Sequence, residues 1–163
     1  MRSAQSKIID RASAIEIVAR LKREGKRVVL ANGCFDTLHV GHTRYLAGAR
    51  HEGDVLIVAI NSDDSVKCLK GLGRPILDQH ARAQLVAALR DVDYVVIFPE
   101  TDVASLLEEL RPNVHAKGTD YTMETVPERA TSERMGIRIA IVGDPKDHST
   151  RGLFESIRKG PHG

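Results

Sequence analysis

Two histidines three residues apart, His39 and His42, are the side chains of this sequence whose types and spacing point most directly to chemistry. They flank Gly41 and stand at the start of a stretch whose pattern predicts a helix. A helix N-terminus favours an anion, because its first N–H groups are unpaired and the helix dipole is positive there. Each imidazole can donate a hydrogen bond to a phosphate oxygen, and Gly41 leaves room for a ligand near the backbone. The spacing therefore predicts a phosphate site.

The elements that position these histidines alternate between strands and helices. Short β-branched runs predict strands at 27–31, 55–60, 94–98, 114–117 and 137–142. Helical patterns lie between and around these strands. They predict helices at 13–23, 42–51, 78–90, 101–110 and 124–135, a short helix that follows the 55–60 strand and ends near 69, and a last helix from about 149. A capping box from Ser13 marks the start of the first helix, and Asp78 can cap the 78–90 helix. Parallel neighbours need crossover helices. The order therefore predicts an α/β fold, Rossmann-like and doubly wound, with a mostly parallel five-stranded sheet and helices on both faces.

Residues suited to ligand binding gather just after predicted strand ends. Three such segments cover residues 33–42, 118–121 and 143–151. The carboxyl ends of parallel strands form the ligand crevice of such sheets, so we expect these segments to meet there. A further segment, 70–75, is rich in Gly and Pro and carries Lys70 and Arg74, which predicts a mobile basic loop.

Length and composition limit the number of domains and the classes of partner further. The 163 residues predict one domain over 1–163, with a core at about 13–158 and loose tails at 1–8 and 159–163. With 24 Lys and Arg against 22 Asp and Glu, charge supports neither a nucleic-acid partner nor a membrane partner. The apolar runs are of strand length, so no membrane span is expected. Two cysteines and no signal-peptide pattern predict a cytoplasmic protein.

Residues 33–36 followed by 39–42 resemble the HxGH signature of the nucleotidyltransferase superfamily, whose members transfer a nucleotidyl group from ATP or CTP to a phosphate-bearing acceptor. Within that superfamily the chain is most similar to the D-glycero-β-D-manno-heptose 1-phosphate adenylyltransferase domain of ADP-heptose synthesis, in lipopolysaccharide biosynthesis. The segments that carry this similarity are 32–36, 69–71 with 73–75, 117–118 with 120–121, and 149–150. The resemblance covers about residues 15–154 and lacks the sugar-kinase domain, which implies a stand-alone transferase.

The resemblance implies roles for particular residues in the transfer of AMP from ATP to a sugar 1-phosphate, with release of pyrophosphate. The catalytic residues would be His39, His42 and Lys70. The nucleotide would contact Gly33, Cys34, Phe35, His39, Gly41, His42, Lys117, Gly118, Asp120, Tyr121, Ser149 and Thr150, and the acceptor would contact Asp36, Lys70 and Arg82. Mg²⁺ would be held mainly by the nucleotide phosphates, with no protein ligand. The partners would be ATP and a phosphorylated sugar, in a homodimer or a higher homo-oligomer.

Three departures from the family pattern bear on the substrates. Residues 144–148 replace a small, glycine-containing approach, Arg151 replaces a second threonine, and Thr119 replaces a second glycine. Asp144 stands where related cytidylyltransferases carry an arginine, which counts against CTP.

Other classes of function remain open at this point. One is a cytidylyltransferase acting on glycerol 3-phosphate or a similar alcohol, and another is a nucleotide-binding module without catalysis. A zinc or redox enzyme would use His39, His42 and Cys34, although Cys34 reads more simply as a packing residue. The remaining histidines are read as turn, surface or core residues: His51, His80, His115, His148 and His162.

Overall fold

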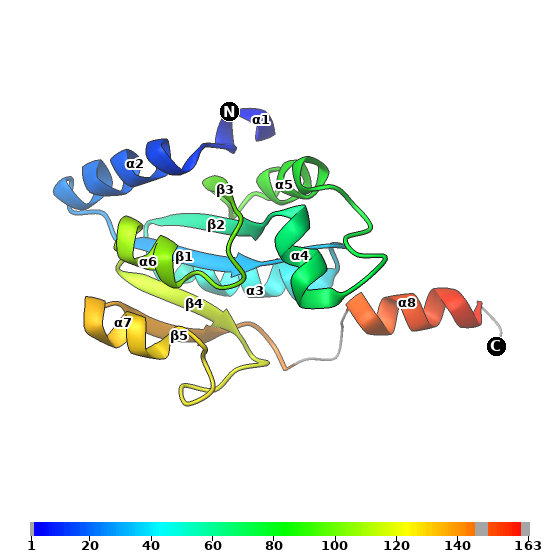
Figure 1. Cartoon of the computed structure of the whole chain (residues 1–163). Coiled ribbons are helices and arrows are strands. Elements are labelled where there is room, and N and C mark those ends of the chain that lie inside the picture. Colours follow the sequence, from blue (N-terminus) through cyan, green and yellow to red (C-terminus); the bar gives the residue numbers. More distant parts are fainter. Residues whose placement is uncertain (1, 146–149, 161–163) are drawn as a thin grey trace.

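A five-stranded, all-parallel sheet forms the centre of the computed structural model, which describes residues 2–145 and 150–160 (Figure 1). Its strands are β1 (Val28–Gly33), β2 (Val55–Asn61), β3 (Tyr94–Phe98), β4 (Val114–Gly118) and β5 (Arg138–Val142). Their spatial order is β3-β2-β1-β4-β5. The chain therefore winds outward from β1 in one direction and then in the other, with the reversal between β1 and β4. This confirms the doubly wound α/β fold predicted from the sequence.

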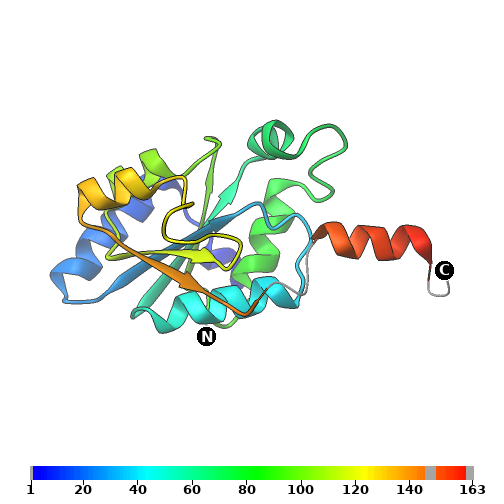
Figure 2. The ribbon, with the colours of Figure 1, turned by 90° about the horizontal axis from the view of Figure 1, so that it is seen from below.

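Helices cover both faces of the sheet (Figure 2). One face packs against α3 (Val40–His51) and α5 (Gln79–Ala87), with α1 (Ala4–Lys7) beside α5. The other packs against α2 (Arg11–Arg23), α6 (Ala104–Leu110) and α7 (Arg129–Met135). The remaining two helices are α4 (Asp63–Lys70), which directly follows β2, and α8 (Thr150–Lys159), which extends away from the body in both ribbon views.

The apolar strand residues supply two separate cores, one on each face. In β2, Leu56, Val58 and Ile60 join the core beneath α3 and α5, whereas Ile57 and Ala59 join the core beneath α2 and α6. Successive side chains of a strand point to opposite faces, so a strand buried on both sides needs a continuous apolar run. That run is what made β2 recognisable in the sequence.

Several helix ends differ from the predictions. Asp10, and not Ser13, caps α2, because its side chain accepts a hydrogen bond from the Ser13 N–H (2.7 Å). The N-terminal segment is not a loose tail, since α1 packs against α5 and Ile8 forms a β-bridge with Val95. At other ends, α5 stops at Ala87 before the predicted 90, α6 begins at Ala104 rather than 101, and α7 begins at Arg129 rather than 124.

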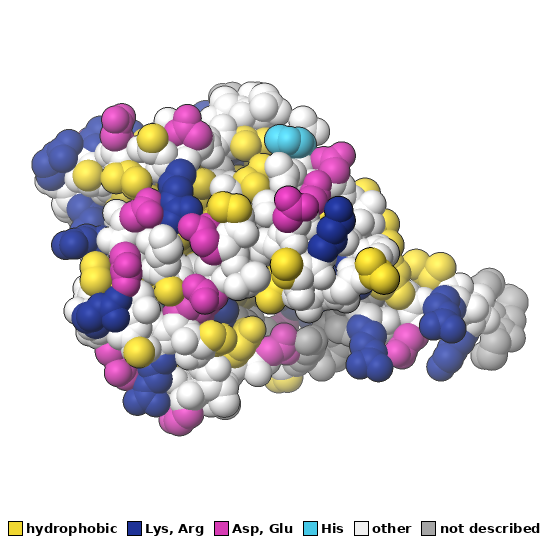
Figure 3. Space-filling view, in the orientation of Figure 1, with side chains coloured by type: hydrophobic (Ala, Val, Ile, Leu, Met, Phe, Trp, Pro, Cys, Tyr) yellow, Lys and Arg dark blue, Asp and Glu magenta, His cyan; other side chains and the backbone are white. Residues whose placement is uncertain are grey.

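The surface carries charges of both signs. On the face drawn in Figure 3, basic and acidic side chains are interspersed rather than gathered into a patch of one sign. Within residues 2–145 and 150–160, no helix has the length and apolar character needed to cross a membrane.

Candidate active site

A cavity of about 660 Å³ opens at the carboxyl ends of the strands, where β1 and β4 part. These strands pair only from Val29–Ala31 to Val114–Ala116. Tyr45 of α3 spans the gap beyond that pairing: its hydroxyl donates to the Ala116 carbonyl (2.8 Å) and accepts from the Asn32 N–H (3.4 Å). Burial raises the pKa of the Tyr45 phenol, so it stays a neutral donor. Tyr45 thus bridges the two strands where they separate, at the crevice in which the predicted residues meet.

Most of the predicted site residues line this cavity. They are Gly33, Cys34, Phe35, Asp36, His39, Gly41, His42, Lys70, Lys117, Gly118, Asp120 and Tyr121. Ser149 and the side chain of Thr150 lie outside the described part of the chain. The helix predicted to begin near 149 begins at Thr150 as α8. Arg82 is not among the lining residues.

The two histidines are fixed by backbone hydrogen bonds at the start of α3. His39 is the N-cap residue, and its Nδ1 accepts from the Gly41 N–H (3.1 Å). The Nδ1 of His42 accepts from the His39 N–H (3.3 Å). A neutral imidazole carries one proton, so a ring whose Nδ1 accepts must carry that proton on Nε2. Both rings therefore present an Nε2–H donor, and they stack with their centroids 3.9 Å apart.

The turn before these histidines depends on Gly33 and Phe35. Phe35 has a left-handed backbone (φ 50°), and its ring lies against His42 at 5.1 Å between centroids. A Cβ on residue 33 would stand 3.0 Å from that ring, so any other residue here would force the ring to shift. Cys34 packs beside Asn61, and burial raises the pKa of its thiol, which disfavours a nucleophilic thiolate.

Asp36 anchors the basic loop to the site. Its carboxylate pairs with Arg74 and accepts from the N–H groups of Ile76 (2.7 Å) and Leu77 (3.2 Å). Asp36 is almost completely buried, so these contacts hold the loop that follows α4 against the turn after β1. Lys70, the last residue of α4, lines the cavity just before that loop.

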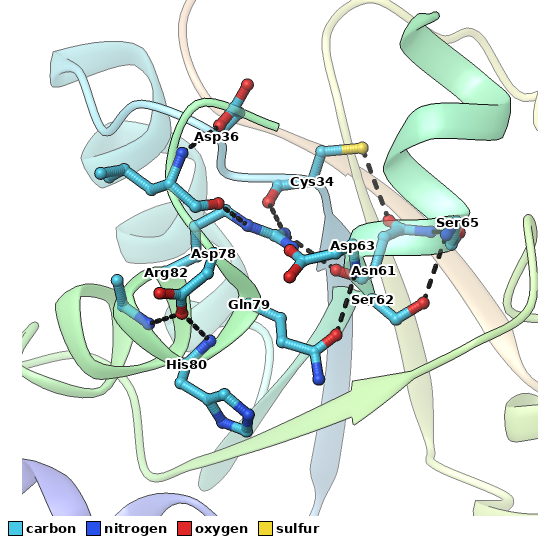
Figure 4. A network of polar contacts seen from close by, with 12 residues as sticks. Cys34, Asp36, Asn61, Ser62, Asp63, Ser65, Asp78, Gln79, His80 and Arg82 are labelled. Carbon is cyan, nitrogen blue, oxygen red and sulfur yellow. Dashed lines mark hydrogen bonds and ion pairs between the residues drawn. The ribbon is translucent and has the colours of Figure 1, made fainter. Parts of the chain in front are cut away.

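Arg82 has a different place from the one predicted. Its side chain is fully buried, and its guanidinium donates to the carbonyls of Leu77 (3.0 Å), Cys34 (2.6 Å) and Asn61 (2.8 Å) and to the carboxylate of Asp63 (2.8 Å) (Figure 4). Two of these carbonyls lie at strand ends, Asn61 as the last residue of β2 and Cys34 directly after β1. The prediction that Arg82 contacts an acceptor phosphate is therefore corrected: it braces the ends of β1 and β2 from below the cavity.

The far wall of the cavity contains a buried ion pair. Lys117 Nζ lies 3.7 Å from Glu128 Oε2 and 4.4 Å from the centre of the Tyr121 ring. Burial lowers the pKa of Lys117, an effect that the Glu128 carboxylate opposes. The sequence did not reveal Glu128, because residues 124–135 were expected to be one helix. In the structure α7 starts at Arg129, and the preceding loop brings Glu128 into the wall.

His115 lies directly behind the site without lining it. It is fully buried, and its Nε2 lies 3.0 Å from Asn32 Oδ1, an atom that can only accept. Burial lowers the pKa of His115 to about 3, so the ring is neutral and donates to Asn32. This agrees with its interpretation as a core residue. His148 and His162 fall outside the described residues.

Two arginines that carried no predicted role also line the cavity, Arg44 near the start of α3 and Arg151 in the first turn of α8. Arg44 Nε lies 3.3 Å from Asp144 Oδ2. The departures at Thr119 and Asp144 prove to be in contact, since the Thr119 hydroxyl donates to the Asp144 carbonyl (2.7 Å). Together with the histidines, Lys70 and Lys117, the cavity is suited to a polyanion.

The sequence and the structure of the chain were both compared with those of known proteins. A family model described as cytidylyltransferase-like matches residues 30–155. Proteins named bifunctional protein HldE are also similar. The one from Geobacter sulfurreducens is 48% identical over 143 residues, 88% of this chain and 29% of that protein. The one from Geotalea uraniireducens is 46% identical over 157 residues, 96% of this chain and 32% of that protein. The chain thus spans about a third of the length of these relatives.

Among solved structures, the crystal structure of the lipopolysaccharide core biosynthesis protein from Thermoplasma volcanium superposes with a TM-score of 0.63 at 26% identity. The superposition covers 75% of this chain and 100% of that one. The matched family segment starts within β1 and ends within α8, so it includes every element that contributes to the cavity.

Proposed function

Because the chain belongs to the cytidylyltransferase-like family, we propose that it is a nucleotidyltransferase that moves AMP from ATP to a sugar 1-phosphate, with heptose 1-phosphate as the acceptor. The family membership agrees with the HxGH resemblance found in the sequence. The bifunctional relatives support the heptose assignment through their similarity of 42–48% identity to this chain. Since the chain spans only part of each relative, it would perform one of their two activities.

The observation that carries this proposal is the matched pair of imidazoles at the start of α3. Both Nδ1 atoms accept backbone hydrogen bonds, so both rings offer Nε2–H as a donor without needing to be charged. Two preorganised donors beside a helix N-terminus suit the charge that develops on phosphate oxygens during transfer. A zinc ligand would instead need an imidazole nitrogen with an unshared pair directed at the metal.

The reaction needs positioning more than covalent catalysis. An oxygen of the acceptor phosphate forms a bond to the α-phosphorus, while the bond from that phosphorus to the β-bridging oxygen breaks and its electron pair leaves with pyrophosphate. His39 and His42 would donate hydrogen bonds to the α-phosphate and to the adjacent β-phosphate. Lys70 would approach from the opposite side with the acceptor, and Asp36 would serve by anchoring the adjoining loop. No proton has to be removed from a phosphate oxygen that is already ionised.

The other wall would hold the nucleoside. Lys117, Gly118, Asp120 and Tyr121 line it, with Glu128 behind Lys117. Backbone groups at the end of β4 can contact the base edge there, and the aromatic ring of Tyr121 offers an apolar surface. Ser149 and Thr150, at the start of α8, are assigned to the β- or γ-phosphate on the family resemblance.

Mg²⁺ fits this arrangement as a companion of ATP. Within residues 2–145 and 150–160, no group of three His, Cys, Asp or Glu side chains is arranged to hold a metal ion. Mg²⁺ commonly keeps several waters and binds substrate phosphates rather than a protein cage. When bound in this way it would neutralise charge on the triphosphate. The two free cysteines support a further proposal, that the reaction takes place in the cytoplasm.

The proposal is tested by measuring pyrophosphate release with Mg²⁺, crossing ATP and CTP against heptose 1-phosphate, glycerol 3-phosphate and no acceptor. We expect turnover only with ATP and heptose 1-phosphate. Turnover with CTP and glycerol 3-phosphate would replace it with the cytidylyltransferase alternative. Nucleotide binding without turnover in any pairing would favour a module that has lost catalysis.

A further inference from the structure

Arg44 is a cavity-lining cation that the proposed mechanism has not yet used. It lies two residues after His42 near the start of α3, and it lines the same cavity as the two histidines. Its Nε is 3.3 Å from Asp144 Oδ2, and the two side chains are 43% and 61% exposed. Arg44 thus reaches from the histidine helix to the loop after β5, across the mouth of the cavity.

Asp144 is held at this mouth by its backbone. The Thr119 hydroxyl donates to the Asp144 carbonyl (2.7 Å), which ties the loop after β5 to the loop after β4. The preceding Gly143 has φ +98°, and a Cβ there would stand 3.3 Å from the Tyr45 Cα. The loop therefore passes close to the start of α3, which brings Asp144 beside Arg44.

We propose that Arg44 binds the β- and γ-phosphates of the nucleotide and the departing pyrophosphate, and that Asp144 occupies its guanidinium until the nucleotide enters. The inference rests on the proposed function, because it names a residue for the leaving group of that reaction. An ion pair this exposed is weak and easily exchanged. A di- or triphosphate offers several charged oxygens in the fork geometry that a guanidinium prefers, so it displaces one carboxylate.

This exchange also bears on the chemical step. As the bond between the α-phosphorus and the β-bridging oxygen breaks, negative charge accumulates on the pyrophosphate. A guanidinium beside that oxygen stabilises the charge, so Arg44 would act in transfer as well as in binding. Asp144 would then compete for Arg44 once pyrophosphate begins to dissociate, which favours release of the product.

Opposite effects of two substitutions test the proposal. Arg44→Gln should weaken ATP binding about tenfold or more, whereas Asp144→Asn should tighten it several-fold, because a carboxylate that competes for Arg44 is removed. A purely structural ion pair predicts that both variants change ATP affinity in the same direction. The probes are ATP, inorganic pyrophosphate and AMP in calorimetric titrations of the whole chain. Affinity for AMP, which lacks the β- and γ-phosphates, should not change.

A matched control and a double variant complete the test. Arg129→Gln removes an arginine of similar exposure whose ion pair with Glu133 lies on α7 (2.7 Å), and it should leave ATP affinity unchanged. In Arg44→Gln/Asp144→Asn, the gain from Asp144→Asn should disappear. If that gain persists, or if Arg44→Gln binds pyrophosphate as tightly as the wild type, the inference is wrong. If the wild type binds neither ATP nor pyrophosphate, the proposed function itself has failed.

Discussion

Replacing His42 separates its two roles, because the same ring that would contact phosphate also stabilises the helix start. Its Nδ1 accepts from the His39 N–H, in a capping box that pairs both histidines with the backbone. His42→Ala removes that acceptor together with the Nε2–H donor. His42→Gln removes the rigid ring that fixes the Nε2–H donor, and its amide NH2 does not extend as far from the backbone acceptor, but it keeps an acceptor at the helix position where glutamine is a natural capping-box partner.

The expected magnitudes differ by role. Loss of one preorganised donor to a transition-state oxyanion lowers kcat by about 100- to 1000-fold, or about 2.7–4 kcal/mol. Loss of a capping acceptor costs about 1 kcal/mol of stability, which lowers Tm by about 2–4 °C in a chain of this size. We therefore expect His42→Ala to lose both activity and stability. His42→Gln should lose a similar amount of activity and keep most of its stability.

The assay is pyrophosphate release at saturating ATP and heptose 1-phosphate, with thermal unfolding of each variant followed by circular dichroism. His51→Gln, on the last turn of the same helix and away from the cavity, provides the control. An active His42→Gln enzyme, with kcat within about threefold of the wild type, would refute the assignment of the imidazole to the transferred phosphate.

Three further predictions concern residues around the cavity. Arg82→Met leaves buried carbonyls and Asp63 without their donor and should cost about 3–5 kcal/mol in chemical denaturation; full stability with lost acceptor binding would restore its phosphate role. Asp36→Asn weakens the hold on Arg74, so the N–H groups of Ile76 and Leu77 should exchange faster with deuterium and the acceptor KM should rise several-fold; unchanged exchange would contradict this. Since burial lowers the pKa of His115 to about 3, the unfolded chain takes up its proton first, so stability falls as the pH drops below about 6.5. His115→Gln should abolish about 2 kcal/mol of the loss between about pH 6 and pH 4, measured by urea denaturation; an unchanged acid sensitivity would show that other groups cause it.

The sheet could be predicted from the sequence because its strands are buried on both faces. Continuous β-branched and apolar runs such as Val55–Ile60 are of strand length and suit a strand buried on both faces. The ends of the strands then determine where the loops emerge. The helix ends were harder, since they depend on contacts with distant residues. α7 starts late because Pro127 interrupts the helix expected over 124–135, and no local pattern marks the contact of Glu128 with Lys117.

The same limit separates the site residues that could be identified from those that could not. His39 and His42 stand in one short motif, and neighbouring backbone N–H groups donate to both rings, so their local sequence was enough to predict a phosphate site. Glu128 and Arg44 form ion pairs with residues distant in sequence, Lys117 in β4 and Asp144 in the loop after β5, which come near only after β4 and β5 have joined the sheet. A motif search has no access to such pairs.

Arg82 and Arg44 show how burial decides what an arginine near such a site can do. The buried guanidinium of Arg82 must keep every donor satisfied, because an unpaired charge there would be very costly, so it cannot leave its carbonyls to follow a ligand. The guanidinium of Arg44 is solvated at the cavity mouth, where exchanging Asp144 for a phosphate costs little. Both residues lie on helices near the same cavity, and the family resemblance favoured Arg82. Desolvation reverses that order, which is why the exposed arginine, and not the buried one, is the better candidate for a ligand that must bind and leave in every turnover.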